Sequence, residues 1–373
     1  MNSIDFRRHL HRHPELSFEE HETAAFIREQ LTAAGISCQS IAQTGVLARI
    51  EGRLTTLETA HRAVVLRADI DALPIEEQTA LPYASQHQGV MHACGHDLHA
   101  AMLYDALLNL HAAPDFAGVV FGLFQPAEEC NPGGASIVLK EDPFVGYDVV
   151  AVIGQHVDWQ LEVGEIGVRE GAFMAASDEL RFTICGKGGH GAMRHLLHDP
   201  VAAAAALTTQ LLALNNASAP RVLSIGKFLA EGATNVVPDA VYMEGTLRTF
   251  DEEDRRNIHN EIHRLVAALD KQHGTSTETD INHGYPNVRN DQTLVAAAQR
   301  IATHNNIRSK TMDRLMTAED FGFYTQRYPA LFYRLGVGAA SGRSHTATYA
   351  PSEEVLPIGS KLLTDLTFEL LKE

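Results

Sequence analysis

The stretch "AVVLRADI", residues 63–70, is a near-continuous apolar run of strand length that ends in charged residues. Two similar runs follow along the chain, "GVVFGLF" at 118–124 and "DVVAVIGQHV" at 148–157. A helical stretch, "HAAMLYDALLNLHAA" at 99–113, separates the first two. Continuous apolar strands that alternate with helices are typical of a parallel sheet covered on both faces. The sequence therefore predicts an α/β layer with a mainly parallel sheet.

The segment 170–281 follows a different pattern. Its expected elements are strand, helix, two strands, helix and strand, with the first helix at 199–216. This βαββαβ order predicts a compact, ferredoxin-like α+β unit inserted into the α/β layer. Outside the insertion, we expect helix over 4–34 with a break at Pro14. We also expect a helix at 291–305, a strand at 330–338 and a last helix from about 357.

Charge and composition narrow the classes of partner. The 373 residues carry a formal net charge of −17, which disfavours a nucleic-acid backbone or an anionic membrane surface as partner. The N-terminus has no apolar signal segment, and the longest apolar run, "VAAAAAL" from Val201, is too short to span a bilayer. The four cysteines are unevenly spaced, which argues against a disulfide framework. The sequence thus predicts a cytoplasmic protein that acts on a small molecule or peptide.

Polar clusters lie where the predicted strands end. "RADIDALP" follows the first strand with Asp69 and Asp71, "QPAEE" follows the second, and "GQHV" ends the third with His156. A fourth cluster, "HACGHDLH" at 92–99, opens a helix. Each cluster alone has an ordinary explanation as a turn, a helix cap or a buried histidine. Because the carboxyl ends of parallel strands meet at one edge of a sheet, we expect these side chains to converge there.

Several motifs together resemble the family of metal-dependent N-acyl-amino-acid amidohydrolases, which includes hippurate hydrolases, auxin-conjugate hydrolases and N-acetyldiaminopimelate deacetylases. The motifs are "LRADIDALP", "MHACGHDLHAA", "FQPAEE", "GKGGHGA", "TNVVPD", "EGTLR" and "EDFGFY". The resemblance implies hydrolysis of the amide bond of an N-acyl-amino acid by a homodimer or higher homo-oligomer. It also makes residues 1–169 and 282–373 a metal-dependent catalytic domain, and residues 170–281 a lid and dimerisation domain.

The resemblance implies a site for two divalent metal ions. The residues that match its ligand positions are Cys94, His96, Glu129, His156 and His345. Anionic ligands lower the repulsion between two neighbouring cations. Mixed sulfur, nitrogen and oxygen donors suit zinc, manganese, cobalt or nickel better than magnesium or calcium.

The same resemblance assigns roles around the metals. Glu128 matches the general base, which takes a proton from the attacking water and passes it to the leaving amine. The "DALP" segment places the catalytic aspartate on Asp71, which would orient a metal ligand through a hydrogen bond. Asp69 is the alternative, and it stands where related peptidases carry a metal-binding histidine. His92 and His99 are expected to form hydrogen bonds around the site, with solvent exposure as the alternative.

Three residues of the expected lid match substrate-binding positions of the family. His190, in "GKGGHGA", is implied to reach the active site of another subunit and to stabilise the oxyanion there. Asn235 and Arg248 are implied to hold the carboxylate of the substrate, although a surface ion pair is the alternative for Arg248. Arg194 stands where the family commonly has proline, so the acyl group and amino acid that are selected stay open.

Two other functions compete with the amidohydrolase. A dipeptidase or aminopeptidase on the same scaffold would need an acidic pair near the metals to bind the amine of its substrate. A catalytically inactive binding protein is expected to have lost ligands or the base, whereas this sequence has all five ligands and Glu128.

Overall fold

The computed structural model describes residues 1–215 and 220–372. Backbone contacts divide the chain into two compact units. Unit 1 consists of Met1–Phe173, Arg289–Asp313 and Asp320–Glu373, and unit 2 consists of Met174–Val288 and Arg314–Glu319. The expected domain boundaries, and the lid and dimerisation roles, stay predictions. Among the described residues, no helix has both the length and the apolar character that crossing a membrane requires.

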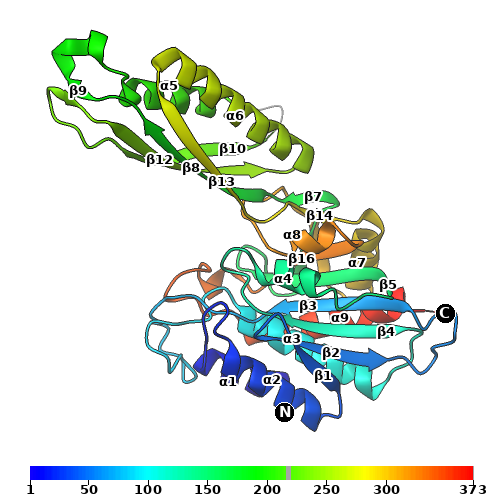
Figure 1. Ribbon diagram of the computed structural model, residues 1–373. Coiled ribbons are helices and arrows are strands. Elements are labelled where there is room, and N and C mark those ends of the chain that lie inside the picture. Colours follow the sequence, from blue (N-terminus) through cyan, green and yellow to red (C-terminus); the bar gives the residue numbers. More distant parts are fainter. Residues whose placement is uncertain (216–219, 373) are drawn as a thin grey trace. The chain divides into compact units, whose positions relative to one another are not determined.

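Unit 1 is built on an eight-stranded sheet with the order β1-β2-β4-β3-β5-β16-β6-β15 (Figure 1). Its central strands β4, β3, β5 and β16 run parallel, as the apolar runs predict. The antiparallel ribbon of β1 and β2 at one edge was not predicted. The strands are β1 (Ser37–Ile41), β2 (Gly45–Glu51), β3 (Arg62–Asp69), β4 (Val119–Gln125), β5 (Asp148–Asp158), β6 (Glu165–Val168), β15 (Arg308–Thr311) and β16 (Ala330–Gly336).

The helices of unit 1 include those that the sequence predicts. The helix expected over 4–34 is two helices on either side of Pro14, so the predicted break is confirmed. The short helices α4 and α8 were not predicted. The helices are α1 (Ser3–Arg12), α2 (His21–Ala33), α3 (His96–Ala112), α4 (Gly134–Glu141), α7 (Gln292–His304), α8 (Gly322–Thr325) and α9 (Leu356–Leu370).

Both faces of this sheet are covered, as two neighbouring residues of β4 demonstrate. Gly122 lies so close to α3 that an added Cβ would stand 2.4 Å from Leu107. The preceding Phe121 points to the other face, because successive side chains alternate along a strand. There its ring packs 5.3 Å from the ring of Phe144, which follows α4. The core therefore holds the central strands rigidly, and the loops at their carboxyl ends start from fixed positions.

Unit 2 has the predicted βαββαβ order. Its four-stranded antiparallel sheet has the order β10-β12-β8-β13, and residues of α5 and α6 complete its hydrophobic core. The first helix ends at Leu212, short of the expected end at residue 216, which lies outside the described residues. The elements are β8 (Ala176–Cys185), α5 (Pro200–Leu212), β10 (Val222–Leu229), β12 (Ala240–Thr249), α6 (Glu252–His273) and β13 (Ser276–His283).

Shorter elements complete the chain. They are β7 (Gly171–Met174), β9 (Gly189–His190), β11 (Val236–Val237), β14 (Val288–Asn290) and the 3-10 turns Gly191–Leu196, Ala339–Ser341 and Glu353–Val355.

Candidate metal centre

Four parallel strands deliver polar residues to one edge of the unit 1 sheet. Asp69 ends β3, the loop with Glu128 and Glu129 follows β4, His156 lies near the end of β5, and His345 lies in the loop after β16. These strands are neighbours in the sheet, with β3 between β4 and β5. The expected convergence of the strand ends is therefore confirmed, and α3 starts at the same edge with His96.

Cys94 precedes α3 on a turn that depends on glycine. Gly95, the cap of α3, has φ +93°, and a Cβ there would lie 2.6 Å from the side chain of Val157. Both the left-handed backbone and this close approach require a residue without a side chain. The turn brings the Sγ atom of Cys94 to 3.3 Å from Nε2 of His156 and to 3.3 Å from Nε2 of His345.

His96 presents a nitrogen that lacks a hydrogen-bond partner. Its Nδ1 lies 2.9 Å from the carbonyl oxygen of Asp71 and 3.2 Å from Oδ1 of the same residue. Both are acceptors, so Nδ1 carries the proton and donates it. Nε2 of His96 is buried without a hydrogen bond among the described residues, 3.9 Å from Oε1 of Glu129. A fully buried nitrogen in this state is poised to bind a cation.

Asp71 lies behind this histidine and also fixes the backbone of the Glu129 loop. Its Oδ2 accepts hydrogen bonds from the amide of Glu129, at 2.9 Å, and from the hydroxyl of Ser17, at 2.7 Å. Burial raises the pKa of Asp71, but the hydrogen bond from His96 and its other partners bring the pKa below its usual value. Asp71 is thus held as a carboxylate, and it contacts a candidate ligand as the sequence predicts.

Asp69 has other partners. Its Oδ2 binds Nη1 of Arg67 at 2.6 Å, and its Oδ1 lies 2.5 Å from Nδ1 of His99. Nε2 of His99 accepts the backbone N–H of Val157 at 2.9 Å. Oδ2 of Asp69 also lies 3.8 Å from Nε2 of the candidate ligand His96. Arg67 and His99 therefore each bind one carboxylate oxygen of Asp69.

His92 and His99 are both buried, which excludes solvent exposure for either. The expected hydrogen bonds are present at His99. Both ring nitrogens of His92 lack a hydrogen-bond partner among the described residues.

The donor atoms form overlapping groups whose members lie within 4.8 Å of one another. Cys94 belongs to two of them, one with His96 and His156 and one with Glu129 and His345. A third group combines His96, Glu129 and Glu128. Two groups that share a thiol match the needs of two neighbouring cations, because a shared anionic ligand reduces their repulsion. The residues present therefore fit two metal ions.

The electrostatics of the cluster favour a cation. Burial, with a smaller contribution from the negative charge of Glu129, raises the pKa of the Cys94 thiol to about 12. Burial and the guanidinium of Arg334 hold the pKa of His156 well below its usual value, so its imidazole is neutral. The side chain of His345 is 52% exposed, whereas that of His96 is fully buried. The cluster thus opens to solvent on the His345 side, where an ion can enter.

Unit 2 brings two of its three predicted residues together. His190 lies on β9, which pairs with β11 beside Asn235, and the amide of Gly191 donates to the carbonyl of Asn235 at 2.9 Å. Arg248 lies near the end of β12, eight residues after Ala240, which places it roughly 26 Å along the strand. Both His190 and Asn235 are exposed, and so is Arg194. The unit thus separates Arg248 from the other two.

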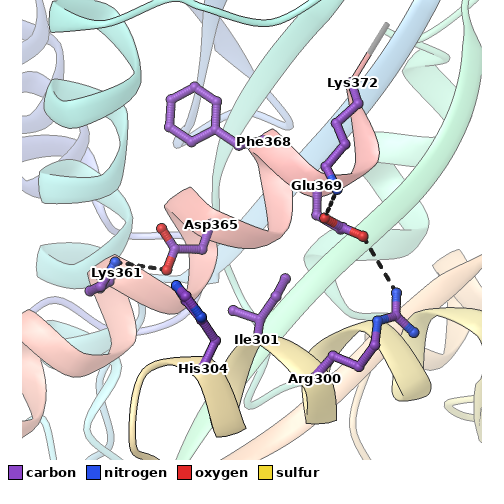
Figure 2. A pocket seen from close by; sticks show the side chains of 8 residues that line it. All are labelled: Arg300, Ile301, His304, Lys361, Asp365, Phe368, Glu369 and Lys372. Atoms are coloured by element: carbon purple, nitrogen blue, oxygen red, sulfur yellow. Dashed lines mark hydrogen bonds and ion pairs between the residues drawn. The ribbon is translucent and has the colours of Figure 1, made fainter.

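A hollow of about 360 Å³ between α7 and α9 is separate from this cluster (Figure 2). Its charged residues pair with one another: Lys361 binds Asp365 at 2.8 Å and Arg300 binds Glu369 at 3.5 Å. None of the predicted site residues lines it.

The residue pattern and the geometry agree with a known family. The model of "Peptidase family M20/M25/M40" matches residues 65–369. The chain belongs to this family. The resemblance found in the motifs is thereby confirmed.

Three relatives of this protein are informative. An N-acetyldiaminopimelate deacetylase of Exiguobacterium sibiricum is 36% identical over 368 residues, which cover 97% of each chain. An N-acyl-L-amino acid amidohydrolase of Geobacillus stearothermophilus is 43% identical over 293 residues, 77% of each chain. A solved structure from Bacillus subtilis, described as a dinuclear metal-binding peptidase of the M20 family, is 35% identical with a TM-score of 0.87, and covers 99% of this chain and 97% of its own.

Among the contacts of the site, those of Arg67 with Asp69 and of Ser17 with Asp71 were not predicted from the sequence. Arg67 had a signal, because it stands two residues before Asp69 on one strand and shares its face. Ser17 had none, because it reaches Asp71 from a loop 54 residues away.

Proposed function

We propose that this protein is a metal-dependent amidohydrolase that removes the acyl group from N-acyl-amino acids with a free carboxylate. The observation that carries the proposal is the pair of donor groups that share Cys94, with Glu128 beside them. The activities named for its relatives, a deacetylase and an amidohydrolase, support the same bond type. The substrate is accordingly a small molecule.

Two divalent ions are the cofactors of this proposal, held by Cys94, His96, Glu129, His156 and His345. The mixture of thiol, imidazole and carboxylate supports zinc, manganese, cobalt or nickel. When bound, such ions lower the pKa of a water molecule and polarise the amide carbonyl.

The protein groups supply the proton transfers. Glu128 is the general base: it removes a proton from the attacking water and delivers it to the nitrogen of the leaving amino acid. Asp71 is the catalytic aspartate of the family motif. Here it orients His96 by accepting the Nδ1 proton, which keeps Nε2 directed into the cluster.

The contacts of Asp69 and Asp71 argue against these two carboxylates as the binding site for a free amine. A dipeptidase or aminopeptidase needs carboxylates that can bind an ammonium group. Asp69 is already bound by Arg67 and His99, and Asp71 by His96, Ser17 and the Glu129 amide. An inactive binding protein is disfavoured because the ligands and the base are all retained.

We further propose that the active form is a homodimer or higher homo-oligomer. A substrate carboxylate spans only a few ångström, whereas unit 2 separates Arg248 from Asn235 by most of the length of β12. One carboxylate can contact both residues only if they come from different subunits. In this arrangement His190 and Asn235 reach the site of the partner subunit, where His190 stabilises the oxyanion.

Mixing two inactive variants tests the shared site. His190→Ala and Glu128→Gln homo-oligomers should each be nearly inactive. Mixed oligomers should regain activity, because one site then combines an intact Glu128 with the His190 of its neighbour. Random mixing makes half of the dimers mixed, and each mixed dimer has one restored site out of two. We therefore expect up to about a quarter of wild-type activity. Activity no higher than the sum of the separate variants contradicts the cross-subunit role.

A substrate panel tests the reaction itself. Metal-free protein is assayed with acetyl-, benzoyl- and succinyl-amino acids and with dipeptides, after addition of manganese, zinc, cobalt or nickel. We expect metal-dependent release of free amino acid from an acyl substrate. Preferred cleavage of dipeptides supports the peptidase alternative, and no turnover in any combination supports the binding protein.

A further inference from the structure

The loop that carries Glu128 and Glu129 contains a backbone conformation that needs support. Ala127 has φ +53°, in the left-handed region that residues with a side chain rarely adopt. It is fully buried, so its N–H and C=O groups must find partners inside the protein. Its carbonyl accepts the amide of Gly134 at 2.9 Å.

The amide of Ala127 is bound by a carboxyl group from a distant part of the chain. Oε1 of Glu20 accepts this N–H at 2.8 Å, and Oε2 of the same side chain accepts the hydroxyl of Thr44. Glu20 is fully buried and directly precedes α2, although its side chain forms no hydrogen bond to the first turn of that helix. It precedes residue 65, where the match to the family begins.

The contact with Glu20 completes a symmetric arrangement around Glu128. The amide before Glu128 is held by Glu20, and the amide after it is held by Asp71. Two buried carboxyl groups thus fix the backbone on both sides of the general base. Since the base must lie within hydrogen-bond reach of its proton, a small rotation of this loop would remove it from the reaction.

A carboxyl group is a costly choice at position 20 if it only fills space. Burial is the main cause that raises the pKa of Glu20 to about 7; the hydrogen bond from Thr44 opposes this shift and the negative charge of Asp71 adds to it. The thiol of Cys130 also lies within electrostatic reach of Glu20. An apolar side chain would avoid this cost but could not accept the amide of Ala127.

We propose that Glu20 is a positioning residue for catalysis, which locks Ala127 in its left-handed conformation and thereby sets Glu128 and Glu129 against the metal centre. Only the kinetic test of this inference depends on the proposed function.

Glu20→Gln and Glu20→Met form the matched pair that tests it. Both replacements are as long as glutamate, but only glutamine can accept the Ala127 amide. At saturating manganese, we expect Glu20→Gln to keep kcat within about threefold of wild type. Glu20→Met should lose roughly 10–100-fold in kcat with KM changed less than threefold, as for a misplaced catalytic group. The same replacements at Glu22, which is exposed on the first turn of α2, serve as controls and should leave both constants unchanged.

Hydrogen exchange of the metal-free protein supplies a readout that does not depend on activity. Exchange in segment 125–130 should accelerate in Glu20→Met and stay slow in Glu20→Gln. If Glu20→Met does not fold, Glu20→Asp, which is one methylene too short to reach Ala127, replaces it in both assays. Equal kcat for the two variants, or unchanged exchange in the variant that cannot reach Ala127, overturns the inference. A wild-type protein without turnover would instead refute the proposed function, and the exchange experiment would still decide the role of Glu20.

Discussion

Glu128→Gln is expected to lower turnover by about 10²–10⁴-fold while both metal ions stay bound, because glutamine has the size of glutamate but cannot take a proton from water. Glu128 lies in the group with His96 and Glu129, close enough to the candidate ligands to act on a water held between them. The measurement pairs steady-state kinetics with metal analysis of the purified variant.

Glu129→Gln is the matched control, since the same chemical change is made at the next residue. Oε1 of Glu129 lies 3.3 Å from Nε2 of His345 and 3.9 Å from Nε2 of His96, between the candidate ligands. This variant should lose metal affinity as well as turnover, and excess metal should restore part of its activity. Excess metal should not rescue Glu128→Gln. Substantial residual turnover of Glu128→Gln, or loss of its metal, would remove Glu128 from the role of base.

The convergence of Glu128 and Glu129 on one site could be predicted only in part from the sequence. Adjacent residues on an extended strand point in opposite directions, so a bend had to follow β4 if both glutamates serve one site. The proline and glycines of "QPAEECNPGG" indicate such a bend. The sequence did not reveal that a non-glycine residue, Ala127, adopts the left-handed conformation, because its support comes from Glu20, more than 100 residues earlier.

In the fold, too, features with a local sequence signal could be predicted, whereas features that depend on distant residues could not. The parallel strands β3, β4 and β5 are buried on both faces and are therefore visible as apolar runs. The edge strands β1 and β15 are largely exposed and polar, as in "RSKT", so they have no such signal. Their pairing depends on neighbours that are distant in sequence, as register in a sheet generally does. Local patterns thus predicted the centre of the sheet and the convergence of its strand ends, while the edges needed the structure.

Cys94→Ser should have the other large effect, on metal binding. Cys94 is the donor that both candidate groups share, so its loss weakens both metal sites. The apparent affinity should fall by more than the 10–100-fold typical of residues that only support a ligand, and the metal content should drop from two ions to fewer than one. Cys185, an exposed cysteine of β8 in unit 2, is the matched control, and Cys185→Ser should keep both ions.

The pH dependence of metal binding separates a thiolate ligand from a bystander. Burial raises the pKa of Cys94 to about 12, so without a cation the group is a protonated thiol throughout the neutral range. Binding as thiolate must release this proton, and affinity should therefore rise with pH, by about tenfold per unit for each proton displaced. Titration calorimetry in buffers of different ionisation enthalpy counts the released protons. Cys94→Ser should release one proton fewer than wild type, since a serine hydroxyl keeps its proton. An equal count in both proteins, with affinity unchanged, would mean that the thiol is not a ligand, and the two donor groups would then have no common atom.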